Sequence, residues 1–153
     1  MTSCNAKATT LIRKPIGEVF EAFVRPEIIT RFWLEATSAP LAKGAEVTWR
    51  FMVPGASETT KVTSFEPPRL IEFDWSDGKH VMLMFDIFKP GITQVTAEMS
   101  GFDPKAAVSE LVNATEGFTI VLCDLKTLME GGKPANLVRD KAELIAASFK
   151  EGA

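Results

Sequence analysis

The chain has 153 residues, of which 46% are hydrophobic and 24% charged, and its formal net charge is −3. It is long enough for one domain with a sizeable core, too apolar for a disordered chain, and without the basic run that nucleic-acid binding favours. No stretch approaches the roughly 18 consecutive apolar residues of a membrane span, the start lacks an apolar signal region, and two isolated cysteines, Cys4 and Cys123, make no disulfide or metal framework, so we expect a cytoplasmic protein without cofactor or metal.

The first part of the chain predicts one strand and two short helices. Residues 3–13 are β-prone. Pro15 suits the first turn of a helix, and apolar residues follow it at helical spacing, which predicts a helix over residues 15–24. A second short helix is predicted from Pro26 to Trp33. Helices this short are unstable alone, so both must pack on a larger element.

From residue 34 the apolar period changes to two, which predicts a series of strands. Asp77-Gly78 predicts a tight hairpin turn in which both central residues have positive φ. Strand signals this dense leave no room for crossover helices, so the sheet is expected to be antiparallel. The predicted strands cover residues 47–53, 59–65, 70–75, 81–88 and 92–99.

Helical spacing returns after Gly101 and predicts one long helix. Asp103 is expected to cap it, with Pro104 at its first position, and Gly131-Gly132 to end it. Its apolar stripe runs for about five turns and can be buried only against the sheet, which makes the fold class α+β.

A last amphipathic segment is predicted over residues 137–149, after Pro134. It can pack on its own domain or on a second subunit, and the oligomeric state stays open. No repeat or linker divides the chain, so we expect one domain over residues 1–153.

Local motifs resemble the activator-of-heat-shock-ATPase-homologue-like branch of the START-like (SRPBCC, polyketide-cyclase-like) superfamily. The most specific is FEPPRLIEFDW, which resembles the family's Pro-Pro-Arg-Leu connection between two strands. The resemblance covers about residues 8–132, and the tail over 133–153 lies outside it. The segments that carry it are residues 13–33 (opening helices), 65–75 (the connection), 93–101 (the last strand) and 116–130 (the closing helix).

This resemblance implies a helix-grip fold, in which a curved antiparallel sheet wraps around a long C-terminal helix and two short helices follow the first strand. It also implies a cavity between the sheet and the long helix. It does not imply one activity, because relatives bind lipids, act as cyclases or hydrolases, or assist a chaperone.

Aromatic and Met side chains suit the lining of such a cavity, although each of them can equally be plain core packing. Met99 stands where many family members have His, which removes a polar group from the cavity. Gly117 either leaves room for a ligand or a close sheet approach, or is a tolerated helix glycine. Thr115 bonds either a ligand or its own backbone. The predicted ligand-binding residues are Trp33, Trp49, Phe51, Phe73, Trp75, Met82, Met84, Met99, Thr115, Gly117, Phe118 and Leu122.

No catalytic residue is predicted. His80, the one histidine, is either a general base or, more simply, a solvent-facing hairpin residue. A carboxylate pair among Asp74, Asp86 and Glu98 depends on a strand register that the sequence does not define. Cys123 lacks an evident base partner and is interpreted as a partly buried thiol.

Three functions follow in order. The first is a carrier or sensor that binds an apolar small molecule without catalysis. The second is a co-chaperone-like protein that stimulates a heat-shock ATPase, which is weaker because a solitary domain lacks the extra N-terminal domain of the eukaryotic activators. The third is a cyclase or hydrolase acting on an apolar substrate, which the single His and the absence of Tyr make weaker still.

Overall fold

The computed structural model describes residues 4–151, which form one seven-stranded antiparallel sheet and four helices. The strand order is β1-β7-β6-β5-β4-β3-β2, so consecutive strands pair from β2 to β7 and β1 closes against β7. The strands are β1 (Ala6–Ile12), β2 (Leu34–Thr37), β3 (Glu46–Phe51), β4 (Ser57–Glu66), β5 (Leu70–Trp75), β6 (His80–Lys89) and β7 (Ile92–Ser100). The helices are α1 (Ile16–Val24), α2 (Pro26–Phe32), α3 (Ala107–Gly131) and α4 (Leu137–Glu151).

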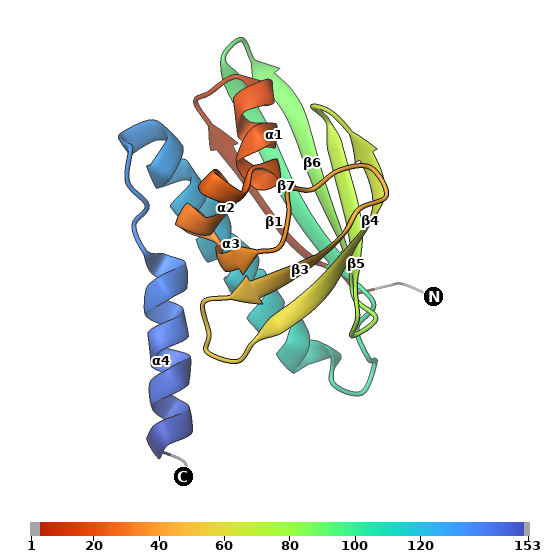
Figure 1. The fold of residues 1–153 in the computed structure, drawn as a ribbon, viewed down its shortest axis with the longest axis vertical. Coiled ribbons are helices and arrows are strands. Elements are labelled where there is room, and N and C mark those ends of the chain that lie inside the picture. Colours follow the sequence, from red (N-terminus) through yellow and green to blue (C-terminus); the bar gives the residue numbers. More distant parts are fainter. Residues whose placement is uncertain (1–3, 152–153) are drawn as a thin grey trace.

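The sheet is curled, and α3 lies along its concave side (Figure 1). The helix packs most extensively against β1, where Lys126 Nζ donates to the carbonyl of Leu11 at 2.6 Å. Helices α1 and α2 cover the same side near the upper end of the strands in Figure 1. The predicted α+β helix-grip fold is confirmed.

The two faces of the sheet differ because side chains alternate along each strand. On β6, Val81, Leu83 and Phe85 are buried, whereas Met82 and Met84 are partly exposed. The register places Val81 between Phe73 of β5 and Met99 of β7, so buried residues of neighbouring strands form one apolar inner face. Trp49 lies in this layer, with its ring centroid 5.1 Å from that of Phe73.

Four details differ from the sequence-based expectation. The short strand β2 was not predicted, and it pairs with β3 across an irregularity in the register. Helix α3 begins at Ala107 because Asp103 accepts a hydrogen bond from the nearby Lys105 amide, at 2.9 Å, within a turn that precedes the helix. The loop between β5 and β6 has four residues, and among them only Gly78 has positive φ (90°).

The tail forms α4, as predicted, and the helix packs on α3 of its own chain (Figure 1). Gly132, with φ 81°, ends α3 in the left-handed conformation that glycine adopts freely. Within the described part of the chain, no helix is long and apolar enough to cross a membrane.

Candidate functional site

Helix α4 is fixed at its first residues by a buried carboxylate of α3. Asp124 is 1% exposed, and its two oxygens accept hydrogen bonds from the amides of Leu137 and Val138, each at 2.9 Å. The first amides of a helix have no partner within it, and the positive end of the helix dipole favours a carboxylate there. This contact satisfies the buried charge and sets where α4 starts relative to α3.

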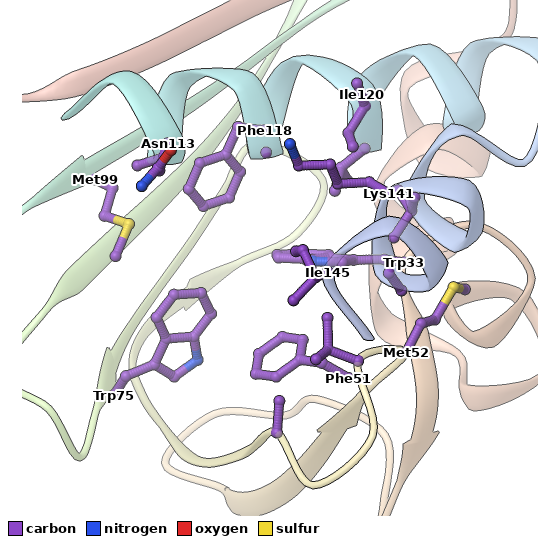
Figure 2. A pocket seen from close by; sticks show the side chains of 17 residues that line it. Trp33, Phe51, Met52, Trp75, Met99, Asn113, Phe118, Ile120, Lys141 and Ile145 are labelled. Carbon is purple, nitrogen blue, oxygen red and sulfur yellow. The ribbon is translucent and has the colours of Figure 1, made fainter. Parts of the chain in front are cut away.

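The position of α4 completes an apolar pocket of about 410 Å³. The pocket lies between α3, α4 and the strands β3, β5 and β7, and it is partly open to solvent. Its size is within the range of small-molecule sites, roughly 300–1,000 Å³. Its lining, drawn in Figure 2, comprises Trp33, Phe51, Met52, Val53, Ala56, Trp75, Met99, Asn113, Ala114, Gly117, Phe118, Ile120, Val121, Val138, Lys141, Ala142 and Ile145.

Aromatic rings supply three walls of this pocket. The ring centroids of Trp33 and Phe118 are 5.9 Å apart, and those of Phe51 and Trp75 are 5.8 Å apart, both in edge-to-face geometry. Trp75 Nε1 donates a hydrogen bond of 3.0 Å to Oγ1 of the fully buried Thr60. The rings therefore hold one another in place, which keeps the space between them shaped before any ligand arrives.

Gly117 leaves room in the helical wall. A Cβ atom at this position would meet nothing within 4 Å, so the glycine does not serve a close approach of helix and sheet. In Figure 2 the neighbouring Phe118 points from α3 into the pocket, opposite Trp75 and Phe51.

The polar groups of the lining are few. Apart from the Trp75 indole and that of Trp33, Asn113 and Lys141 are the lining residues with polar side chains, and the described lining contains no His, Asp or Glu. Lys141 Nζ lies 2.8 Å from Glu116 Oε1, and the two side chains are 44% and 51% exposed. Figure 2 shows the Lys141 nitrogen and the Asn113 amide on either side of Phe118, next to α3.

The structure brings half of the predicted ligand-binding residues together in the pocket and places the other half elsewhere. Those that line it are Trp33, Phe51, Trp75, Met99, Gly117 and Phe118. Trp49, Phe73 and Leu122 are buried in the core.

Met82, Met84 and Thr115 lie away from the pocket, which corrects their placement in the cavity. The two methionines occupy the outer face of the sheet, because they alternate with the buried residues of β6. Thr115 is exposed on α3, where its carbonyl accepts a hydrogen bond from the Thr119 hydroxyl at 2.7 Å. The apolar face of α3 passes through Ala114 instead, which leaves Thr115 at its edge.

Sequence reasoning missed the contributions of α4 and of the loop after β3. On α4 the lining residues Val138, Lys141, Ala142 and Ile145 recur at the spacing of one helical face, which the sequence did display. Met52, Val53 and Ala56 come from the loop between β3 and β4, for which no periodicity gives a signal.

His80 lies outside the pocket, on the outer face of the sheet. Its Nδ1 lies 2.6 Å from Asp74 Oδ1, and its Nε2 lies 3.0 Å from Glu72 Oε1. Partial burial acts to lower the pKa of the imidazole, but the hydrogen bonds and charges of the two carboxylates outweigh it and raise the pKa above 6.5. His80 is therefore held between two carboxylates and is not a free solvent-facing residue.

The remaining predicted reactive groups are separate from one another. The register pairs Asp74 with His80, Asp86 with Gln94 and Glu98 with Met82. Cys123 is exposed on α3, which corrects its expected partial burial. Within residues 4–151 no group of three His, Cys, Asp or Glu side chains is arranged to hold a metal ion.

A second hollow, of about 610 Å³, lies between α1 and the cis Pro67-Pro68 peptide bond. Although it is larger, Lys14, Glu18, Glu21 and Arg25 take part in its lining, and it is away from α4. We regard the smaller apolar pocket as the candidate binding site because its lining is almost wholly hydrophobic.

Comparison with known proteins gives a consistent result. The model of the family described as "Activator of Hsp90 ATPase homolog 1-like protein" matches residues 13–130. A search of curated proteins found no match. Among solved structures, protein SSP2350 from Staphylococcus saprophyticus is 29% identical, with a TM-score of 0.77, covering 86% of this chain and 95% of that one.

Two further structures are similar in fold alone. The Aha1 dimer from Colwellia psychrerythraea is 17% identical, with a TM-score of 0.75 over 85% of this chain and 98% of that one. CalU16 from Micromonospora echinospora is 16% identical, with a TM-score of 0.67 over 96% of both chains. Because the latter match leaves only about six of the 153 residues uncovered, it extends into α4.

Proposed function

Since the chain belongs to the Activator of Hsp90 ATPase homolog 1-like family, we propose from this premise that it is a carrier or sensor of an apolar small molecule, which it binds between the sheet, α3 and α4 without converting it. The observation that carries the proposal is the apolar pocket of about 410 Å³, walled by aromatic rings that are already packed against one another. Pre-formed apolar walls reduce the cost of ordering side chains on binding.

The residues around the pocket also favour binding over acid–base chemistry. The titratable group of the described lining is the ammonium of Lys141, while the imidazole of His80 is on the other face of the sheet. Flexible Met52 and Met99 side chains at the edge suit ligands of more than one shape.

The test is a titration with N-phenyl-1-naphthylamine, a neutral dye whose fluorescence rises in apolar surroundings. We expect saturable binding of one dye per chain. Gly117→Leu should abolish the binding, because the added side chain enters the empty space beside Phe118. Gly117→Ala is the matched control, since its Cβ meets nothing within 4 Å and its helix propensity is better by about 1 kcal/mol.

Two outcomes would contradict the proposal: no saturable binding to the folded wild-type protein, or equal binding by the wild type and Gly117→Leu. Circular dichroism and a urea unfolding curve for each variant establish that the protein is folded in both cases.

A second function, stimulation of a chaperone ATPase, is favoured by the family and by two exposed apolar residues of α3. Val108 and Val112 are 79% and 63% exposed and lie one helical turn apart. If this function holds, Val108→Ser with Val112→Ser should reduce the stimulation of an Hsp90-type ATPase, whereas Gly117→Leu should leave it unchanged.

A further inference from the structure

We propose that the apolar pocket prefers aromatic molecules that carry one acidic group, and that Lys141 of α4 binds this group at the rim. This inference rests on the proposed function and adds the chemical class of the ligand. The residue that would set the preference lies in the segment beyond the family match, which ends at residue 130.

The first argument is the position of Lys141 on α4. Val138 and Ile145 lie on the same face of the helix, three residues before and four residues after it, and both line the pocket. The aliphatic stem of the lysine therefore forms part of the apolar wall, while its ammonium group reaches the solvent boundary at 44% side-chain exposure. A cation at this boundary meets the polar end of a ligand whose apolar body is inside.

The second argument is that donors exceed acceptors at this rim. Lys141 supplies a cation and Asn113 an amide, and Figure 2 shows both beside Phe118. In the structure Lys141 is paired with Glu116, whose side chain is 51% exposed and does not line the pocket. Exposed ion pairs of this kind are weak, so the acidic group of a ligand can replace Glu116, which then turns to solvent.

The third argument concerns the body of the ligand. Trp33, Phe51, Trp75 and Phe118 present ring faces and edges to one space, and no other charged residue takes part in the described lining. Aromatic rings pack favourably against such walls, and a single acidic group can be accommodated only at the rim.

The test compares two dyes with the same ring skeleton. N-phenyl-1-naphthylamine is neutral, and 8-anilino-1-naphthalenesulfonate carries one sulfonate. Lys141→Gln should raise the Kd of the sulfonate dye about fivefold and leave the Kd of the neutral dye within about twofold. Glu116→Gln removes the same ion pair but keeps the cation, so it should lower the Kd of the sulfonate dye. Lys141→Arg keeps the charge and should preserve the preference.

Equal weakening of both dyes by Lys141→Gln would overturn the inference, because the lysine would then only help to position α4. An unchanged Kd for the sulfonate dye would overturn it as well. Both results leave the proposed function intact, since that function fails only if the neutral dye does not bind to the pocket.

Discussion

The imidazole of His80 bridges Glu72 and Asp74 on the outer face of the sheet, at 3.0 and 2.6 Å. Both neighbours are on β5 and accept hydrogen bonds best when the imidazole is doubly protonated. Because the pKa of His80 is raised above 6.5 in the folded chain, the folded state binds the proton more tightly than the unfolded state does.

The resulting contribution to stability is complete below about pH 6.5 and is lost as the pH rises through the raised pKa. We therefore expect the difference in unfolding free energy between the wild type and His80→Gln to be larger at about pH 6 than at about pH 8.5. The side chain of His80 is 34% exposed, so solvent screening limits this change to less than about 1 kcal/mol. Urea unfolding curves at both pH values measure it, and a difference that does not depend on pH would contradict the expectation.

At the scale of single elements, α4 depends on one carboxylate. Asp124→Ala removes the acceptor of both the Leu137 and the Val138 amides, and loss of such a cap costs about 1–2 kcal/mol. We expect these two amides to exchange with solvent faster and the neutral dye to bind less tightly, while the sheet stays folded. Hydrogen exchange measured by mass spectrometry or NMR follows both effects.

Asp140→Ala is the matched control for this change. Asp140 is an exposed acid in the first turn of the same helix and makes no side-chain contact with the two amides. Equal loss of protection in the two variants would mean that net charge near α4, and not the buried cap, fixes the helix.

The order of elements could be predicted because each is defined by a strong local pattern. Alternation marked β3 and β5, and the long apolar stripe marked α3. Other features depend on distant partners. Strand β2 has four residues and is stabilised by pairing with β3, and the role of Asp124 depends on an amide thirteen residues away. Nothing in the local sequence distinguishes this acid from an exposed one.

At the scale of the whole molecule, the pocket joins distant parts of the chain, from Trp33 to Ile145. A ligand bound there stabilises the folded state as a whole. With the neutral dye at one hundred times its Kd, the free energy of unfolding should rise by about 2.7 kcal/mol in the wild type. Urea unfolding with and without dye measures this, and Gly117→Leu should show no increase. An equal increase in both proteins would indicate binding outside the pocket.

The candidate site could be predicted only in part, for reasons of geometry. The sequence from Val81 to Phe88 is apolar at nearly every position, so alternation could not show which side chains face inward. Pairing with Phe73 and Met99 decides this in favour of Val81 and against Met82. On α4 the apolar spacing was visible, but the surface that it would cover was not.

The junction between α3 and α4 has a consequence for how such a protein can change. Gly132 ends one helix, and Asp124 receives the next through backbone amides, which every residue except proline possesses. A replacement segment therefore needs only a helix that starts at the same place. Four side chains on one face of that helix can be exchanged, with their charge and shape, while the sheet inherits no new constraint. Diversity in what is recognised can then accumulate in a terminal cassette, separately from the part of the chain that must fold.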